Sequence, residues 1–210
     1  MEWPFFDLRL ACGEVVLRGV TDADLDPLLA VLPDDLEHDP RHQPFLPPAT
    51  DRRRVFSAEV WTHRGTWSPG SWCLDLAVEV DGRVVGVQAL EGEDFPLLRT
   101  VDSFSWLARD VRGRGLATAM RTAVLALAFD HLGAVAAVSS AEVGNAPSLA
   151  VSRRLGYADN GLSRTNSPNG VIELQHVRLL AETWRAAGHQ VQIDGAEACL
   201  PWFGLDAEVS

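Results

Sequence analysis

A strand-to-helix junction that contains two glycines is the feature that most constrains the fold of this chain. Residues 105–117 read Ser-Trp-Leu-Ala-Arg-Asp-Val-Arg-Gly-Arg-Gly-Leu-Ala. Gly113 and Gly115 carry no Cβ, so the backbone can turn sharply there and approach a ligand closely. The amides that open the following helix lack intrahelical partners and lie at the positive end of its dipole. The sequence therefore predicts a loop that binds phosphate oxygens.

The charge distribution favours a small polyanionic ligand over a polymer. The net charge is -11, which argues against a nucleic-acid groove because phosphate backbones require a basic stripe. Residues 109–154 nevertheless hold six arginines against three acidic residues. Arg112 and Arg114 flank the first loop glycine, and the guanidinium group matches phosphate geometry. A solvated helix face explains the same local charge, and charge alone favours that explanation.

The three cysteines indicate free thiols in a reducing compartment. Cys12, Cys73 and Cys199 are widely spaced and form no CxxC pair, which argues against a disulfide framework or a zinc site. The first residues lack the positive start of a signal peptide. The longest apolar run, residues 116–129, is too short to span a bilayer and contains Arg121. We expect a cytoplasmic protein with neither a membrane nor a nucleic acid as partner.

The hydrophobic pattern predicts one α+β domain over residues 1–210. Apolar residues alternate along residues 74–80, and Asp81-Gly82 is a strong hairpin signal. The spacing then becomes helical along residues 116–131. A proline-rich loop is expected over residues 33–50, where it would shape a substrate pocket. Strands are predicted at 13–18, 74–80, 84–90, 100–107, 135–140, 157–165 and 171–179, and helices at 25–32, 52–64, 116–131, 145–155 and 180–187.

Three kinds of phosphate loop can be compared with residues 112–118. A Walker loop requires a lysine, and this chain has none. A dinucleotide fingerprint requires a third glycine where Thr118 stands, and it follows a parallel sheet, whereas a hairpin meander is predicted here. The pattern R/Q-x-x-G-x-G/A is satisfied at every specified position by Arg112-Gly113-Arg114-Gly115-Leu116-Ala117.

That loop and a second motif resemble the GNAT superfamily of N-acyltransferases. Residues 145–157, Asn-Ala-Pro-Ser-Leu-Ala-Val-Ser-Arg-Arg-Leu-Gly-Tyr, are similar to the N-x-x-S/A-x-x-V/L-x-x-x-x-G-F/Y signature after the fifth strand of that family. Residues 177–184 resemble the ending of its ribosomal-protein N-acetyltransferase branch, so the resemblance covers roughly residues 14–185. The opening at residues 3–8 and the Phe95-Pro96 turn also resemble an actinobacterial subgroup that uses succinyl-CoA.

The resemblance implies a fold and a reaction. The fold would be the GNAT fold, a mixed sheet of about six to seven strands with helices on both faces, and residues 186–210 would form a C-terminal extension. The reaction would move an acyl group from an acyl-CoA, acetyl-CoA by default and succinyl-CoA as the alternative, to a primary amine without a metal. The acceptor would be a small-molecule amine or a protein N-terminus. The branch also implies a homodimer.

The resemblance further assigns residues to the cofactor. Backbone groups of Leu107 and Arg109 would pair with the pantetheine arm, and Arg112 with the amides that follow it would hold the pyrophosphate. Asn145 and Ser148 would lie near the thioester, Ser152 beside them, and Arg153 near the adenosine phosphate. Asn145 is equally explained as a helix N-cap and Arg153 as a solvated residue. The predicted pyrophosphate amides are those of Gly113, Arg114, Gly115, Leu116, Ala117 and Thr118.

The catalytic groups are the least constrained part of the prediction. Many members of the family carry a tyrosine acid seven residues after the motif asparagine, where this chain has Ser152. Ser148 is the acid that the ribosomal-protein branch implies. Glu142, directly after the fifth predicted strand of the family core, is the first candidate for the base, with Asp102 and Glu91 as alternatives. The missing tyrosine also keeps open a non-catalytic CoA-binding sensor or scaffold.

Overall fold

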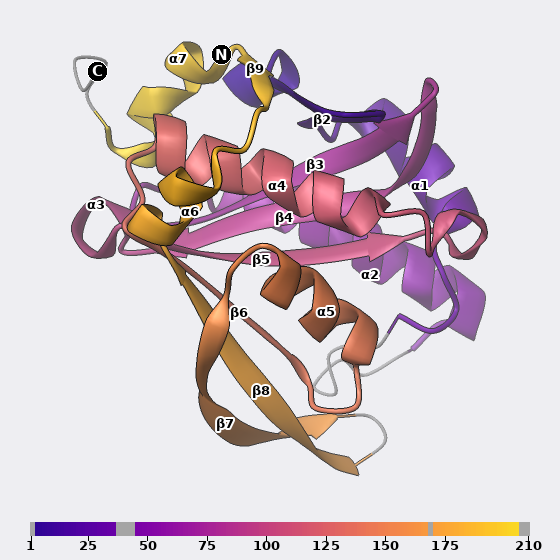
Figure 1. The fold of residues 1–210 in the computed structure, drawn as a ribbon. Coiled ribbons are helices and arrows are strands. Elements are labelled where there is room, and N and C mark those ends of the chain that lie inside the picture. Colours follow the sequence, from indigo (N-terminus) through magenta and orange to yellow (C-terminus); the bar gives the residue numbers. More distant parts are fainter. Residues whose placement is uncertain (1–2, 37–44, 168–169, 206–210) are drawn as a thin grey trace.

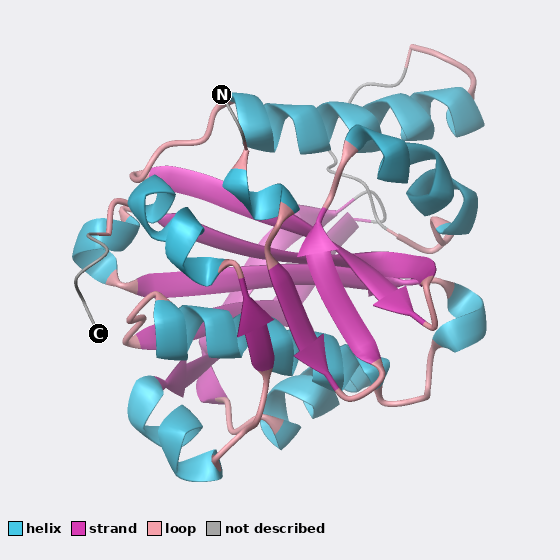
Figure 2. Ribbon diagram, turned by 90° about the horizontal axis from the view of Figure 1, so that it is seen from above, coloured by secondary structure: helices cyan, strands magenta, loops and turns pink. Residues whose placement is uncertain are grey.

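A nine-stranded mixed sheet forms the centre of the molecule. The computed structural model describes residues 3–36, 45–167 and 170–205. Within these residues the strand order is β7-β8-β6-β5-β4-β3-β2-β1-β9, and helices cover both faces of the sheet (Figure 1, Figure 2). The strands are β1 (Arg9–Cys12), β2 (Val15–Gly19), β3 (Ser71–Val80), β4 (Arg83–Glu93), β5 (Thr100–Leu107), β6 (Ala136–Glu142), β7 (Ala158–Ser167), β8 (Gly170–Leu180) and β9 (Gln192–Asp194).

The predicted fold class is confirmed, and the sheet is two strands wider than expected. The short strands β1 and β9 were not predicted, because each lies among turn residues and carries too few apolar residues for a clear alternation. The helices are α1 (Leu25–Val31), α2 (Pro48–Gly65), α3 (Phe95–Leu98), α4 (Leu116–Ala126), α5 (Ala146–Arg154), α6 (Ala181–Ala187) and α7 (Ala196–Cys199). Residues 37–44 of the predicted proline-rich loop lie outside the described residues.

The two faces of the sheet have separate cores because side chains alternate along each strand. On one face α1 and α2 pack over a small cluster that includes Ala77, Val87 and Trp106. The other face carries the larger core, into which α4 buries Leu116, Met120 and most of its remaining side chains. As predicted, Phe56 and Val60 are the inward residues of α2. Each strand of the centre therefore offers one set of residues to α2 and the other set to α4.

The sheet opens between β5 and β6. These strands run parallel and pair only at Thr100 with Ala136 and at Val101 with Ala137. β5 then stays paired with β4 as far as Leu107, while β6 turns away and pairs with β8. The hairpin β7–β8 extends away from the body on the β6 side of this opening (Figure 1). Beyond Val101, β5 therefore has no strand partner on its β6 side in the described structure.

Aromatic side chains join the two ends of the described chain. Trp3 packs against Trp67 and Trp202 with ring centroids 5.4 and 4.8 Å apart. Phe203 is fully buried beside Phe5, and β9 adds to the outer edge of β1. The segment after α6 is thus packed onto the body as far as residue 205. No helix among the described residues is long and apolar enough to cross a membrane.

Candidate functional site

The glycine loop joins the end of β5 to the start of α4, as predicted. A short 3-10 turn at Arg109–Val111 leads into it, and Gly113 and Gly115 have φ angles of 78° and 86°. L-residues rarely adopt such values, and no atom of the described residues outside the adjoining chain lies within 4 Å of a Cβ built at either glycine. The glycines are therefore needed for the backbone conformation, and the space beside them is open. Gly115 is the N-cap residue of α4.

The first amides of α4 are arranged to bind an anion. The first bonds inside the helix run from the Thr118 and Ala119 amides to the Gly115 carbonyl, at 3.0 and 3.3 Å. The amides of Gly115, Leu116 and Ala117 precede the first bonded amide and therefore have no partner inside the helix. They lie at the positive end of the helix dipole. The Thr118 amide is already used within the helix, so it is the weakest of the predicted pyrophosphate donors.

Arg112 connects this loop to the segment after α1. Its Nε donates to the Leu107 carbonyl at 3.0 Å, and its two terminal nitrogens donate to the Asp35 carboxylate at 2.7 and 3.0 Å. Arg109 approaches the same carboxylate at 3.4 Å. The bonds from Arg112 hold the pKa of Asp35 well below its usual range. The sequence around Asp35 does not predict this contact, because the partners of Asp35 are over seventy residues away in the chain.

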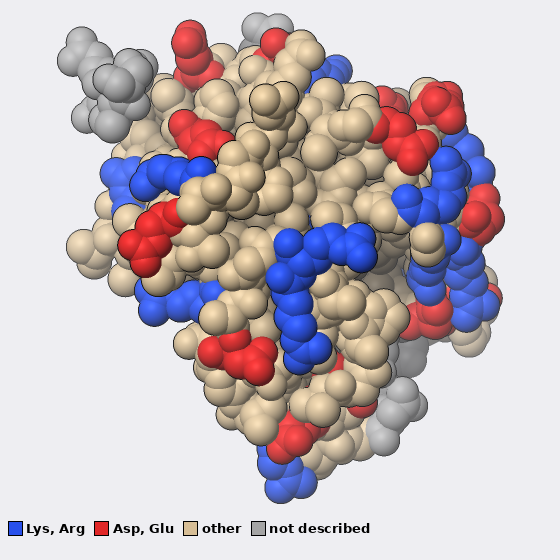
Figure 3. All heavy atoms as spheres, viewed as in Figure 1, with Lys and Arg blue, Asp and Glu red and all other residues tan. Residues whose placement is uncertain are grey.

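The other loop arginine is also paired with an acid. Arg114 lies 3.1 Å from Glu14, and Arg83 lies 2.9 Å from Asp110. Figure 3 shows that basic and acidic side chains are mixed toward the loop end of α4, and that basic side chains in the region of α5 also have acidic side chains beside them. Arg153 and Arg154 are the exposed basic residues of that helix.

Helix α5 begins and is held as its motif predicts. The Asn145 side chain accepts the Ser148 amide at 3.2 Å, which makes Asn145 a true N-cap. Ser152 is buried; its hydroxyl accepts a bond from Arg121 at 3.0 Å and donates to the Ser148 carbonyl at 3.3 Å. Ser152 therefore fastens α5 to α4. Ser148 is half-buried in the first turn of α5.

Arg121 is a buried charge that the sequence did not assign to any site. Only 6% of its surface is exposed, inside a helix whose other buried residues are apolar except for Thr122. Its charge lowers the pKa values of both Asp102 and Tyr157, although burial dominates and raises both. Arg121, Asp102 and Tyr157 therefore share one partly buried electrostatic environment at the opening of the sheet. The Tyr157 hydroxyl is buried there with no hydrogen-bond partner among the described residues.

Two partly buried carboxylates face α2 from neighbouring strands. Glu91 on β4 is directly opposite Asp102 on β5, on the same face as Val87 and Trp106. Burial raises the pKa of Glu91, and the charge of Asp102 raises it further. Burial also raises the pKa of Asp102. Carboxylates with raised pKa values are suited to accept a proton near neutral pH. Glu142, the first candidate base from the sequence, is exposed at the end of β6.

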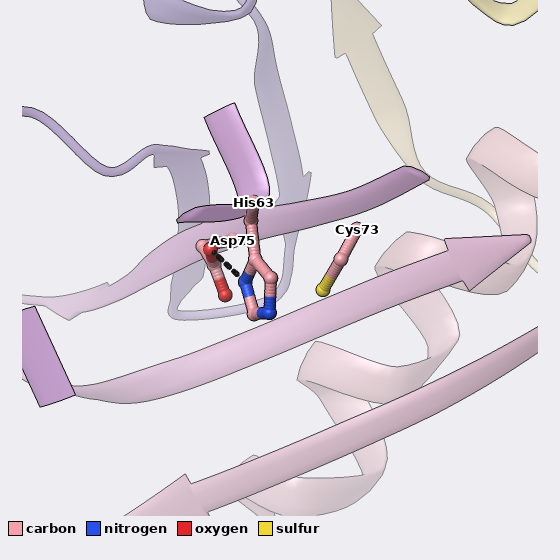
Figure 4. Close-up of side chains that lie close together, drawn as sticks. All are labelled: His63, Cys73 and Asp75. Atoms are coloured by element: carbon pink, nitrogen blue, oxygen red, sulfur yellow. Dashed lines mark hydrogen bonds and ion pairs between the residues drawn. The ribbon is translucent and has the colours of Figure 1, made fainter. Parts of the chain in front are cut away.

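A third group of polar residues adjoins these carboxylates. His63, in the last turn of α2, bonds through Nδ1 to Asp75 on β3 at 2.7 Å, and this bond raises the pKa of His63. Cys73 lies on the same face of β3 as Asp75 (Figure 4), and it is directly opposite Glu91 in the strand register. Burial, aided by the nearby carboxylates, raises the pKa of the Cys73 thiol well above its usual range. While no cation is bound, Cys73 is therefore a protonated thiol and a poor nucleophile, whereas a thiol that coordinates a metal ion releases its proton.

The sequence matches a family of acetyltransferases and a protein named as an acetyltransferase. A family described as an acetyltransferase (GNAT) domain matches residues 14–158. The Bacillus subtilis (strain 168) protein named "Putative ribosomal N-acetyltransferase YdaF" is 30% identical over 113 residues. That alignment covers 53% of this chain, and it spans 61% of the length of the relative.

Solved structures show the same fold at lower identity. Mycobacterium smegmatis RimJ in complex with CoA-disulfide has a TM-score of 0.71 at 22% identity, covering 90% of this chain and 98% of that one. A GCN5-related N-acetyltransferase from Brucella melitensis has a TM-score of 0.67 at 22% identity, covering 85% and 80% of the two chains.

Proposed function

The chain belongs to the acetyltransferase (GNAT) family, and from that premise we propose that it transfers an acyl group from acyl-CoA to a primary amine. The observation that carries the proposal is the junction of β5 and α4. Among the described residues, the edge of β5 that faces away from β4 has no strand partner beyond Val101, and this edge leads directly to the open glycine loop. An extended arm with amide groups can add to such an edge while its phosphates reach the helix amides.

The proposed position of acyl-CoA follows from that junction. The pantetheine arm runs along β5, and its amides pair with backbone groups of Leu107 and Arg109. The pyrophosphate lies on the amides from Gly113 to Thr118, with Arg112 beside it. The thioester then lies near Asn145 and Ser148, and Arg153 approaches the adenosine phosphate. Ser152 contributes by holding α5 in place through Arg121.

In the proposed reaction the neutral amine nitrogen attacks the thioester carbonyl carbon. A C–N bond forms, the C–S bond breaks, and the amine loses a proton while the coenzyme A sulfur gains one. Glu91 and Asp102 are the best placed of the candidate bases, because they are partly buried with raised pKa values and lie on the strands next to the opening. Glu142, which is exposed, is the alternative base that the sequence motif suggests. Ser148 is the proposed acid.

The proposed acceptor is a protein N-terminus, and the proposed donor is acetyl-CoA. The name of the B. subtilis relative supports both, since it is that of a ribosomal N-acetyltransferase. The acids around the proposed acceptor face, Glu91, Asp102 and Asp75, would attract a cationic amine. Succinyl-CoA and small-molecule amines are the alternatives that the test must include. We also propose a homodimer in the cytoplasm, as in the sequence-based expectation.

The proposal is tested by thermal unfolding followed by turnover. A ligand at a hundred times its Kd stabilises a protein by about 2.7 kcal/mol, or roughly 5–10 °C in Tm for a chain of this size. We expect that shift with acetyl-CoA and none with NADH, and release of free coenzyme A thiol when peptides with free N-termini are added. Succinyl-CoA is run in parallel to identify the donor. If no acyl-CoA shifts the Tm, the proposal is wrong.

A coenzyme A-binding scaffold without catalysis is the second candidate. The observation in its favour is that the usual tyrosine acid is replaced by Ser152, whose hydroxyl is occupied by Arg121 and the Ser148 carbonyl. A Tm shift without thiol release on a broad panel of amines and peptides would support the scaffold. Turnover with any amine would exclude it.

A further inference from the structure

Three potential metal ligands of different chemistry converge on the α2 face of the sheet. One nitrogen of His63, the Cys73 sulfur and one Asp75 oxygen all lie within 4.8 Å of one another. Figure 4 shows the imidazole standing between the two β3 side chains. In a tetrahedral zinc site, with bonds of about 2.0–2.3 Å, neighbouring ligand atoms are roughly 3.3–3.7 Å apart. The cluster therefore lies within about an ångström of binding distances, which side-chain rotation can supply.

The fold brings these ligands together from two rigid elements. Cys73 and Asp75 are two residues apart on β3, so both side chains point to the same face. His63 is in the last turn of an eighteen-residue helix that packs on that face, and its bond to Asp75 already fixes the imidazole. Sites built on strands and helices hold their ligands more accurately than sites on loops.

The neighbouring strand carries a further carboxylate, and the surroundings of the cluster favour a cation. Glu91 is directly opposite Cys73 in the strand register. The charges that act on His63 come from Asp75, Glu59 and Glu91, all of them acidic. Several carboxylates in a partly desolvated position repel one another, and a bound cation offsets that repulsion. The mixture of imidazole, thiolate and carboxylate suits a borderline-soft metal such as Zn²⁺ and disfavours Mg²⁺ and Ca²⁺, which prefer oxygen ligands alone.

We propose that His63, Cys73 and Asp75 form a binding site for Zn²⁺, with Glu91 or a water molecule in the fourth position. The site clamps the C-terminal end of α2 to β3. It is separate from the glycine loop, so it does not depend on the proposed acyl transfer. A metal here would also occupy the surroundings of Glu91, one of the proposed bases, and would thereby connect metal binding to the acceptor side of the cleft.

The experiment titrates Zn²⁺ into chelator-treated, full-length protein by calorimetry and repeats the titration with Co²⁺ while recording visible absorption. We expect one ion per chain, a higher Tm with the metal, and a cobalt spectrum with the intense bands of tetrahedral thiolate ligation. Changes to outer-shell partners of metal sites reduce affinity by about 10–100-fold, so loss of a direct ligand in Cys73→Ser should exceed that range. His63→Gln should do the same, although glutamine can still bond to Asp75.

Cys12→Ser is the matched control, because Cys12 is a half-buried thiol in the same sheet outside the cluster. It should bind Zn²⁺ like the wild type. Each variant must have the same Tm as the wild type without metal, which shows that it is folded. Each must also keep the Tm shift with acetyl-CoA, so that a failure of the acyl-CoA proposal is recognised separately. Absence of stoichiometric binding in the wild type, or equal binding in Cys73→Ser and His63→Gln, would show that the cluster is only a hydrogen-bonded bridge.

Discussion

The glycine loop and the α2 face of the sheet are the two chemical regions of this molecule, and they are encoded differently. The loop lies within residues 109–118, so its geometry depends on neighbouring residues and on the glycine conformations at Gly113 and Gly115. The α2 face combines Glu91, Asp102 and the His63 cluster from one helix and three strands. A local motif can be recognised from its order, whereas the second region exists only after the sheet has formed.

The two regions also treat charge differently. The described arginines of the loop are paired with acids across its surface, as Arg112 is with Asp35. On the α2 face, by contrast, two acidic residues are neighbours: Glu91 lies beside Asp102, and burial raises the pKa of both. A site for phosphates and a site that accepts protons from a cationic amine require these opposite arrangements. We therefore expect variants in the glycine loop to affect acyl-CoA binding and variants on the α2 face to affect proton removal.

The largest expected effect comes from removing the base on the α2 face. If Glu91 or Asp102 takes the proton from the amine, Glu91→Gln or Asp102→Asn lowers kcat by about 10²–10⁴-fold. The Tm shift with acetyl-CoA should stay as in the wild type, because neither side chain lies in the glycine loop. Steady-state thiol release gives kcat, and Glu142→Gln is measured in the same series. A large loss in Glu142→Gln alone would transfer the role of base to the motif carboxylate.

The next largest effect is expected at the glycine loop. Gly115→Asp places a negative charge and a Cβ at the N-cap of α4, so the stabilisation by acetyl-CoA, about 2.7 kcal/mol or roughly 5–10 °C at a hundred times the Kd, should be lost. Gly82→Asp is the matched control: Gly82 has a φ of 74° and no described residue beyond its chain neighbours within 4 Å of a built Cβ, but it lies in the β3–β4 turn. If both variants keep the shift, the loop is not the phosphate site.

A smaller effect is expected in the pH dependence of stability. The pKa of Glu91 is raised in the folded state, so the protonated form stabilises the fold below the ordinary carboxyl pKa of about 4.3, and that stability is lost as the pH rises through the raised value. Glu91→Gln removes this loss, so the variant should become more stable than the wild type as the pH approaches 7. Each unit of pKa elevation corresponds to about 1.4 kcal/mol.

Urea unfolding of both proteins between pH 4 and pH 8 measures that difference. The charged or titratable groups acting on Glu91 are Asp102, His63, Asp75 and Glu93. In an Asp102→Asn background, the advantage of Glu91→Gln should shrink, because one repelling carboxylate is already gone. A difference that stays constant with pH would mean that Glu91 titrates normally in the folded protein.

The sequence predicted the loop region well because its determinants are local. The end of β5, the two glycines, the start of α4 and the Asn145 cap all follow from neighbouring residues, and the structure contains each of them. Repeated apolar spacing also gave the central strands and α2 with small errors in their bounds. The wider sheet was missed because β1 and β9 are only four and three residues long and are held by long-range pairing.

The α2 face was not predicted because strand register brings its residues together. Glu91 and Asp102 were named only as alternatives to Glu142, and sequence spacing could not show that they are directly opposite each other. Cysteine spacing argued against a zinc site, yet a mixed cluster of His63, Cys73 and Asp75 has no cysteine pair to detect. In the sequence Arg121 interrupts an apolar run, which indicates a solvent-exposed residue no more than a buried one. In the structure it is buried and bonded to Ser152.

The smallest expected effect lies at the contact between the glycine loop and the segment after α1. Asp35, after α1, holds Arg112 and Arg109 of the loop, and its negative charge stands next to the proposed pyrophosphate position. Asp35→Asn keeps the size and removes the charge, so acetyl-CoA should bind a few-fold more tightly, with a larger gain at low ionic strength because exposed charges are screened by salt. Calorimetric titration at two salt concentrations measures both.

Asp26→Asn is the control for that variant, because Asp26 forms an exposed pair with Arg53, 3.3 Å apart, between α1 and α2. Removing the same charge there should leave acetyl-CoA affinity almost unchanged. Weaker binding in Asp35→Asn would reverse the interpretation: Asp35 would then orient Arg112 for the phosphate instead of competing with it. In that case the loop would share the property of the α2 face, since its binding geometry would also depend on a residue distant in the sequence.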